Sequence, residues 1–278
     1  MPRSMWWGDW AFSRPATLSI IDLVESKTLD FKLAGLLWLI MESRPSVLVA
    51  SAPIFAGKTT LLHSLLDLLP PGIRQYTLKG FAEDFEFADR FKPERTYLVS
   101  EEISNHQYEY LWGDQVPKTF RLLRRGYRLG ATIHARNVRD VAYLLHSYLE
   151  VPLADMARLG IVVTLQAMNG PSYDDDPIRR IDSVSIITMD DKNLVAQMLA
   201  VRESLDDDFA YPEETVLREA LARKFAVGYD NVSAEVAARE KMLRRMQENG
   251  IHTREDVKKA VAEYYRSRLP GCDDRRPS

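Results

Sequence analysis

A lysine and two threonines stand in a pattern that could bind phosphate groups. Residues Val47–Ala50 are apolar and typical of a buried strand, and positions 52–60 read Ala-Pro-Ile-Phe-Ala-Gly-Lys-Thr-Thr. A Gly-Lys-Thr triplet between a strand and a helix ends the P-loop pattern, in which the lysine reaches phosphates and the threonine hydroxyl reaches Mg²⁺. The leucines of 61–69 predict that helix, and Pro70 ends it. These residues predict a phosphate site at a helix N-terminus.

A second segment offers carboxylates at the end of a strand. Thr96–Val99 is apolar and predicts a strand, and Ser100-Glu101-Glu102 follows it. A carboxylate at this place could hold Mg²⁺ or activate the water that attacks a phosphate. Because neighbouring side chains on a strand point to opposite faces, only one glutamate can face the loop. Two solvated acids at a strand end are the alternative, and the segment taken alone favours that alternative.

An acidic cluster and one histidine complete the set. Glu83 and Asp84 lie among apolar residues in Phe81–Glu86, and His134 ends the strand predicted at Gly130–Ile133. A lone histidine in such a strand is more often a satisfied core or surface residue than a ligand contact. A functional role for His134 is favoured over an ordinary core or surface role only because all four segments occur together in this order.

The four segments together resemble those of the ATPases that drive type II and type IV secretion, type IV and tight-adherence pili, and the archaellum. In that family the phosphate loop reads Gly-Pro-Thr-Gly-Ser-Gly-Lys-Thr-Thr, against residues 52–60 here. The other three motifs are Glu-Asp-x-x-Glu, Val-Gly-Glu and Thr-x-His-Ala. They correspond to Glu83-Asp84-Phe85-Glu86, Val99-Ser100-Glu101 and Thr132-Ile133-His134-Ala135, and the resemblance covers residues 15–266.

The resemblance implies a ring ATPase, a homo-hexamer or mixed ring, that binds Mg-ATP between subunits and docks on an inner-membrane platform protein. Glu101 would polarise the attacking water, Glu83 would assist, and His134 would sense the γ-phosphate. The implied Mg²⁺ ligands are Thr59, Asp84 and Glu101. The implied phosphate contacts are Ala52, Pro53, Ala56, Gly57, Lys58, Thr59 and Thr60.

Departures from the family pattern leave a second function open. Ala52 and Phe55 replace glycines, which such loops use because glycine reaches positive φ and lets the backbone approach the phosphate. Most of the family's N-terminal domain, which supplies arginines over the nucleotide, has no counterpart in the chain. Four arginines are candidates to replace them, although a surface role is the commoner one: Arg124, Arg125, Arg128 and Arg136. The alternative function is a degenerate, regulatory subunit of such a motor.

The retained Lys58, Thr59, Glu101 and His134 favour a working ATPase over the regulatory subunit. A small-molecule kinase is disfavoured, because no arginine-rich lid segment follows in the expected place and the acidic and histidine segments would be coincidences.

Strand and helix patterns alternate from residue 19 to residue 190 and predict an α/β fold with a mostly parallel sheet, the RecA-like core of such ATPases. Helices are predicted at Ser19–Val24, Thr28–Glu42, Val116–Arg125 and Val138–Tyr148, and further strands at Ile73–Thr77, Ile161–Leu165 and Asp182–Ile187. The predicted domains are an aromatic N-terminal arm (1–18), the ATPase domain (19–190), a helical C-terminal region (191–266) and a disordered tail (267–278).

The composition is that of a globular protein. Of 278 residues, 46% are hydrophobic and 28% charged, and the net charge of −3 gives no indication of nucleic acid as a partner. The single cysteine excludes a disulfide within the chain, which fits a reducing compartment. No secretory signal is visible, and the apolar segment Leu33–Met41 is too short to span a bilayer. The predicted location is the cytoplasm, with membrane contact only through a partner.

Overall fold

One mixed β-sheet organises the chain. The computed structural model describes residues 18–53, 56–168, 177–203, 208–226, 228 and 230–268. In this part of the chain the sheet has eight strands in the order β2-β3-β4-β1-β5-β6-β7-β8. The strands are β1 (Ser46–Ala50), β2 (Arg74–Thr77), β3 (Thr96–Ile103), β4 (Arg128–Ile133), β5 (Leu159–Met168), β6 (Ile178–Asp190), β7 (Asn193–Arg202) and β8 (Phe209–Ala210). Neighbours from β2 to β5 are parallel, and the later pairs are antiparallel. The predicted α/β fold class with a mostly parallel sheet is confirmed.

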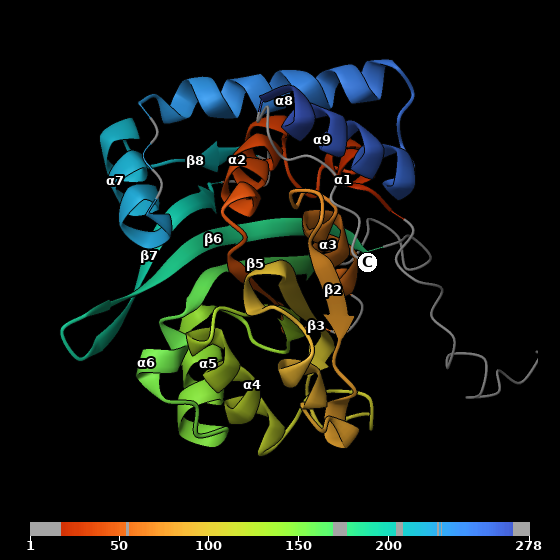
Figure 1. Ribbon diagram of the computed structural model, residues 1–278. Helices are drawn as coiled ribbons and strands as arrows, with labels where there is room; N and C mark the ends of the chain where they lie inside the picture. The colour runs from red at the N-terminus through yellow and green to blue at the C-terminus, as the bar shows by residue number, and fades with distance from the viewer. Residues whose placement is uncertain are drawn as a thin grey trace, which may run out of the picture.

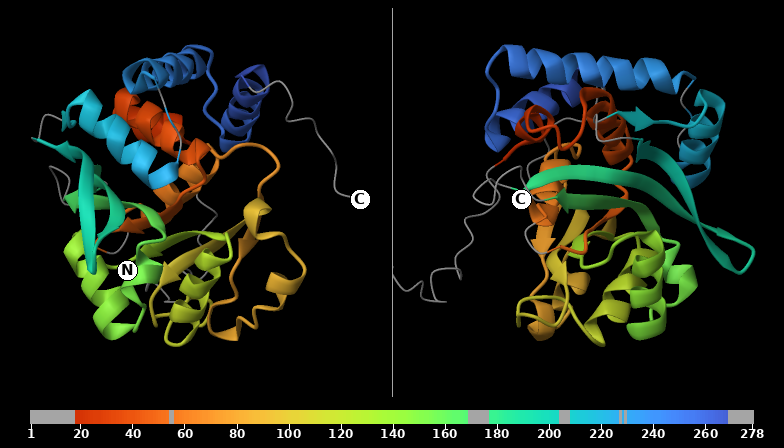
Figure 2. Two further views of the ribbon diagram at one scale, coloured as in Figure 1. Left: turned by 60° about the vertical axis from the view of Figure 1, so that its left-hand side comes forward. Right: turned by 180° about the vertical axis from the view of Figure 1, so that it is seen from behind.

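Helices cover both faces of the sheet (Figures 1 and 2). One face carries α1 (Ile20–Glu25), α2 (Phe31–Glu42), α3 (Lys58–Leu66), α8 (Val232–Glu248) and α9 (Arg254–Arg268), and the other carries α4 (Gln115–Arg124), α5 (Val138–Ala142) and α6 (Leu153–Met156). A π-helical turn, Tyr143–Tyr148, continues α5, and α7 (Glu214–Phe225) precedes α8. Because strand side chains alternate, Val47 and Val49 of β1 join one core while Leu48 and Ala50 join the other.

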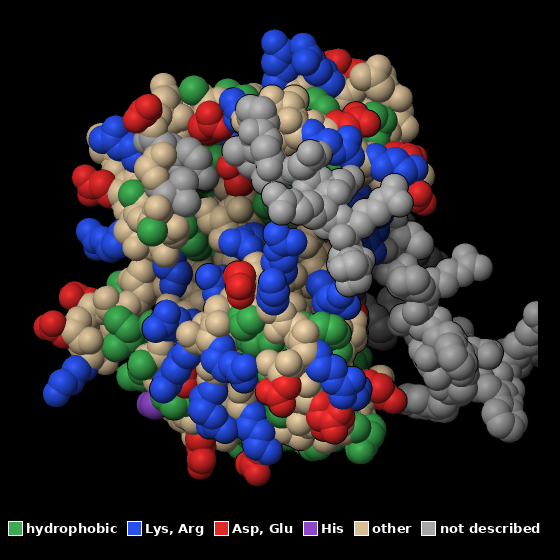
Figure 3. Space-filling view, viewed as in Figure 1, with side chains coloured by type: hydrophobic (Ala, Val, Ile, Leu, Met, Phe, Trp, Pro, Cys, Tyr) green, Lys and Arg blue, Asp and Glu red, His purple; other side chains and the backbone are tan. Residues whose placement is uncertain are grey.

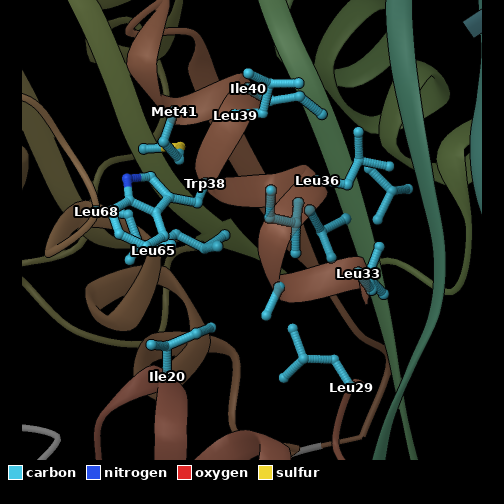
Figure 4. Close-up of a cluster of buried hydrophobic side chains, with 14 of the residues drawn as sticks. Ile20, Leu29, Leu33, Leu36, Trp38, Leu39, Ile40, Met41, Leu65 and Leu68 are labelled. Atoms are coloured by element: carbon cyan, nitrogen blue, oxygen red, sulfur yellow. The ribbon is translucent and has the colours of Figure 1, made fainter. Parts of the chain in front are cut away.

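The helix α2 lies at the centre of the first core. Its residues Leu33–Met41 are all buried, and Trp38 packs near Leu65 and Leu68 at the end of α3 (Figure 4). Gly35 lets α8 approach closely, because an added Cβ would lie 2.9 Å from the carbonyl oxygen of Val236. Among the described residues, the structure has no helix with the length and apolar character to cross a bilayer.

Polar contacts join α9 to the C-terminal end of α3. The Arg254 guanidinium donates to both carboxylate oxygens of buried Asp67, at 2.6 and 3.0 Å, and to the carbonyl of His63 at 3.4 Å. The Tyr265 hydroxyl donates to the carbonyl of Leu68 at 3.1 Å. These contacts tie the helix that begins at Lys58 to the last helix of the chain.

Two expected boundaries can be compared with the structure. The second helix begins at Phe31, three residues after the expected Thr28, because the Asp30 carboxylate accepts the backbone N–H of Leu33 and caps the helix there. Asp30 was the second residue expected near this N-terminus, besides Thr28. The chain is also not helical from residue 191. A tight turn with Asp191 at φ 50° joins β6 to β7, so residues 193–202 continue the sheet and helices return only at Glu214.

The division into domains stays a prediction. Residues 1–17 of the predicted arm and 269–278 of the predicted tail lie outside the described residues.

Candidate functional site

The predicted phosphate loop joins β1 to α3. Gly57 is the N-cap of α3 with φ 84°, a left-handed conformation that favours glycine. Within the described residues no side chain caps this helix, so its first N–H groups are available to an anion. Arg179 of β6 packs against the same glycine, because an added Cβ would lie 3.1 Å from its Cδ. Ile54 and Phe55 lie outside the described residues.

The other residues predicted in the loop surround this turn. Ala52 and Pro53 are exposed, Ala56 is buried, and Thr59 and Thr60 are half-buried in the first turn of α3. A ring nitrogen of His134, Nδ1, lies 3.3 Å from the carbonyl oxygen of Ala52.

Lys58 is a buried cation with few partners. The residue is 6% exposed, and its ammonium nitrogen lies 3.4 Å from each ring nitrogen of His134. Burial lowers the pKa of the Lys58 ammonium below its ordinary value, and the nearby charge of Glu102 offsets only part of that effect. The site therefore holds a positive charge that an anion would stabilise.

A β-bulge in β3 separates the two adjacent glutamates. Ser100 pairs with Ala131 and Ile103 pairs with Ile133, so Glu101 and Glu102 together lie opposite one residue of β4. The bulge directs Glu102 toward the loop, where its Oε1 lies 3.2 Å from Nε2 of His134.

Glu101 has a different partner, on the helix α3. Its Oε1 lies 3.0 Å from Nε2 of His63 on α3. Its side chain is 43% exposed, against 13% for Glu102. Glu102 is thus the glutamate beside His134, whereas Glu101 is beside His63. The bulge interrupts the regular alternation on which the expectation of a single loop-facing glutamate depended, and the role of Glu101 stays a prediction.

Two buried polar atoms at this edge of the sheet lack partners. In the described part of the chain, Ser51 Oγ and Glu102 Oε1 are buried and make no hydrogen bond. The Glu102 oxygen is within ion-pair distance of His134, but the geometry is not that of a hydrogen bond. Buried polar atoms are normally hydrogen-bonded, and exceptions concentrate where a ligand, water or ion belongs.

The acidic cluster forms a loop of its own. Glu83 is buried, and its two carboxylate oxygens accept the backbone N–H groups of Lys79 at 2.8 Å and Phe85 at 3.0 Å. Asp84 accepts the N–H of Glu86 at 3.0 Å and the ammonium of Lys79 at 3.2 Å, and both contacts lower its pKa. The hydrogen bonds of Glu83 and Asp84 are thus local, and the structure does not bring either carboxylate together with Lys58.

The four candidate arginines have other partners. Arg124 pairs with Asp155, and Arg136 pairs with Asp140. Arg125 donates to the carbonyl of Ala88 at 3.0 Å, and Arg128 donates to that of Arg44 at 3.0 Å. Arg124, Arg125 and Arg136 are exposed and Arg128 is half-buried, which agrees with the surface interpretation for the first three. Lys and Arg side chains are numerous on the face that Figure 3 shows.

Sequence reasoning missed Arg179 and named Glu102 only as one of two candidate glutamates at the strand end. The sequence does not distinguish Glu101 from Glu102, because it gives no signal for the extra residue of the bulge. Arg179 is 121 positions after Lys58 (179 − 58) and carried no motif of its own. Only the antiparallel return of β6 beside β5 places it against the loop.

Comparisons with known proteins give a partial likeness. No protein-family model matches the chain, and no curated protein sequence is significantly similar. The VirB11 ATPase from the Brucella suis type IV secretion system, solved with sulphate, is 18% identical over 64% of this chain and 62% of its own, with a TM-score of 0.38. The Legionella pneumophila ATPase DotB is 12% identical over 87% and 63%, with a TM-score of 0.39. The pilus retraction motor PilT with bound ADP is 12% identical over 80% and 63%, with a TM-score of 0.37.

These proteins are of the kind that the sequence motifs resemble. The chain spans less than two thirds of the length of each. At such identities and TM-scores the likeness is one of fold only, and the function is inferred from the site residues themselves.

Proposed function

We propose that this chain is a P-loop ATPase of the secretion and pilus motor kind, which binds Mg-ATP and hydrolyses it. The observation that carries the proposal is the convergence of Lys58, Glu102 and His134. They come from α3, β3 and the end of β4, and Lys58 and His134 are 76 residues apart in the sequence. They meet outside the carboxyl ends of parallel strands, where α/β sheets bind ligands.

The phosphates are bound by charge and by the helix terminus. The Lys58 ammonium and the first N–H groups of α3 provide positive potential at one place, and Gly57 leaves room for the backbone to approach the ligand. Arg179 lies against Gly57 and adds a second cation from β6. Two cations of this kind stabilise the charge that spreads over the transferred phosphoryl group.

Glu102 is proposed to orient the attacking water in place of Glu101. Its Oε1 is buried, makes no hydrogen bond and lies beside His134. The His134 ring can therefore hold the Glu102 carboxylate in position. Phosphoryl transfer depends on positioning and electrostatics, so one well-placed carboxylate is enough for this step. His134 contacts both Glu102 and Lys58 and is the residue best placed to respond to a γ-phosphate.

The residues present fit a magnesium ion. The Thr59 hydroxyl and the Glu102 carboxylate are hard oxygen donors of the kind that Mg²⁺ takes, and Glu102 Oε1 lacks a hydrogen-bond partner within the described residues. When bound, Mg²⁺ neutralises phosphate charge. Glu83 and Asp84 are proposed to shape the neighbouring loop, since their hydrogen bonds are with its backbone and with Lys79.

Assembly and location belong to the same proposal. A homo-hexameric or mixed ring, docked in the cytoplasm on a membrane platform protein, would give the hydrolysis a mechanical use. Analytical ultracentrifugation with and without Mg-ATP tests this part, and a monomer under every condition contradicts it.

The alternative is a regulatory subunit that binds nucleotide without turnover. It is favoured by one observation, because the Lys58 ammonium already contacts the His134 ring and must leave it to reach a phosphate. The deciding experiment measures phosphate release from Mg-ATP by the wild type and by Lys58→Ala. Equal background rates in both, together with saturable binding of ATP by the wild type, would replace the ATPase by the regulator.

A further inference from the structure

Three side chains beside Lys58 could together bind a metal ion. They are Glu102 at the bulge of β3, His106 in the loop after β3, and His134 at the end of β4. Each offers one ligand atom, and the three atoms all lie within 4.8 Å of one another. His106 plays no part in the site described above and is 61% exposed.

The two distances from Glu102 to the histidines are close to those between ligands around zinc. Zn²⁺ binds nitrogen and oxygen at about 2.0–2.1 Å, so the corners of its tetrahedron are roughly 3.3 Å apart. Glu102 Oε1 lies 3.2 Å from His134 Nε2 and 3.6 Å from His106 Nδ1. Both distances are within ion-pair range, but Glu102 Oε1 is buried and has no hydrogen-bond partner among the described residues, as expected of an atom that an ion would bind.

We propose that Glu102, His106 and His134 form a binding site for a divalent transition metal ion of the zinc class. Two imidazoles and one carboxylate select such an ion over Mg²⁺, which prefers oxygen ligands only. Three protein ligands leave the fourth tetrahedral position open to water. The site is therefore distinct in chemistry from the nucleotide's magnesium, although Glu102 belongs to both.

The ion would act as an inhibitor of the proposed ATPase. It fixes Glu102 and His134 to His106, so the carboxylate can no longer orient water for the reaction. The ion also repels the Lys58 ammonium, which lies 3.4 Å from His134, so its affinity stays below that of a closed structural zinc site. Only this inhibitory consequence rests on the proposed function; the metal site itself does not.

A second cluster in the molecule supplies a matched control. His252 lies 3.7 Å from Asp22 and 3.6 Å from Glu25 and forms the other described group with ligand spacing. It lies at the junction of α1 with the turn before α9, and all three of its side chains are at least a quarter exposed. We expect ion pairing there and no stable metal complex, since the charges are solvated.

Binding is tested by titrating the full chain, without nucleotide, with Co²⁺ and then Zn²⁺. Calorimetry gives affinity and stoichiometry, and the visible absorption of tetrahedral Co²⁺ reports the geometry. We expect one ion per wild-type chain, affinity at least about tenfold weaker in His106→Ala, and wild-type affinity in His252→Ala. Unchanged binding in His106→Ala, or loss of binding in His252→Ala, would overturn the proposal. Circular dichroism confirms that both variants fold.

Inhibition is tested separately on Mg-ATP turnover. We expect Zn²⁺ to inhibit the wild type and His252→Ala, and to inhibit His106→Ala only at concentrations at least about tenfold higher. Turnover without added zinc should be the same in all three. If zinc binds as expected but turnover is unaffected, the inhibitory role is wrong. If the wild type shows no turnover at all, the proposed ATPase fails while the metal site stands.

Discussion

Two buried cations, Arg239 of α8 and Lys58 of α3, differ in their partners and in the direction of their pKa shifts. Arg239 is 1% exposed and forms ion pairs with Glu42 and Glu235, the latter at 2.7 Å. Burial alone would lower the pKa of its guanidinium, but the two glutamates raise it above its ordinary value. Lys58 is 6% exposed, its pKa is lowered by burial, and its contacts with His134 are 3.4 Å long.

The difference is between a charge that the fold pairs with carboxylates and a charge whose contacts are long, and the proposed function assigns the second charge to phosphate binding. The Arg239 charge is paired with two carboxylates of the fold, although its Nε makes no hydrogen bond in the described part of the chain. Breaking such a buried ion pair leaves an uncompensated charge. A buried cation with weak partners keeps part of its desolvation penalty until an anion arrives. The paired charge of Arg239 lies in the layer formed by α2, α8 and α9, and the weakly paired charge of Lys58 lies at the edge of the sheet where β1, β3 and β4 end.

The largest effect is expected on turnover in Lys58→Ala. Removing the buried ammonium should lower kcat for Mg-ATP by about 10²–10³-fold, roughly 3–4 kcal/mol of transition-state stabilisation. Steady-state phosphate release measures this. The protein should stay folded, since Lys58 holds no element in place. A variant that unfolds would show that Lys58 is as structural as Arg239.

The converse change is Arg239→Ala. It should lower the free energy of unfolding by about 3 kcal/mol, because it breaks a buried ion pair and removes the cation that Glu42 faces, while Glu235 keeps its ion pair with Arg268. Urea unfolding followed by circular dichroism measures the change. Lys259→Ala removes an exposed cation of α9 and is the control, with no change in the unfolding midpoint expected. Equal effects of the two variants would contradict the contrast.

The bulge in β3 predicts unequal roles for adjacent acids. Glu102→Gln should lower kcat by about 10²-fold, whereas Glu101→Gln should lower it by less than about fivefold. The two variants make the same chemical change at adjacent residues, one beside His134 and one beside His63, so each is the control of the other. If Glu101→Gln has the larger effect, the acid aligned by the sequence motif is the functional one and the bulge is irrelevant to turnover.

The smallest effect is a gain of stability in Lys58→Met. Because the native pKa of Lys58 lies below the unfolded value, burying the charged form costs free energy at pH 7, and methionine should raise the free energy of unfolding by about 1 kcal/mol. Wild-type Lys58 becomes neutral in the folded state as pH rises above its native pKa, which lies below 10.5. The gain in the free energy of unfolding from methionine should therefore shrink between that native pKa and 10.5. Urea unfolding at pH 7 and pH 9.5 measures the change. A loss of stability at pH 7 would contradict it.

Much of the core fold followed from periodicity. β1 and its helix were predictable because an apolar strand, a glycine and a leucine-rich helix are local patterns, and the caps at Ser19 and Asp30 are short-range signals. The β6–β7 hairpin was missed because its turn, at Asp191, has charged residues on both sides that are also typical of a helical surface.

The candidate site was predictable as a set of motifs but not as a geometry. Lys58 and His134 carry signals in their own segments, and the structure brings them together as the resemblance implied. The choice between Glu101 and Glu102 depends on one unpaired residue in β3, and Arg179 depends on a strand pairing between distant segments. Neither the unpaired residue of the bulge nor the pairing of β6 with β5 can be predicted from the local sequence.

The helix α3 begins at the predicted phosphate loop, and Asp67 at its other end forms a salt bridge with Arg254. A hydrogen-bonded helix of nine residues is stiff along its axis, so it moves as a unit rather than compressing. If Lys58 moves along the axis of α3, Asp67 moves with it, and the salt bridge to Arg254 transmits this movement to α9. If the loop binds nucleotide as proposed, the C-terminal helix is mechanically coupled to it through the salt bridge between Asp67 and Arg254.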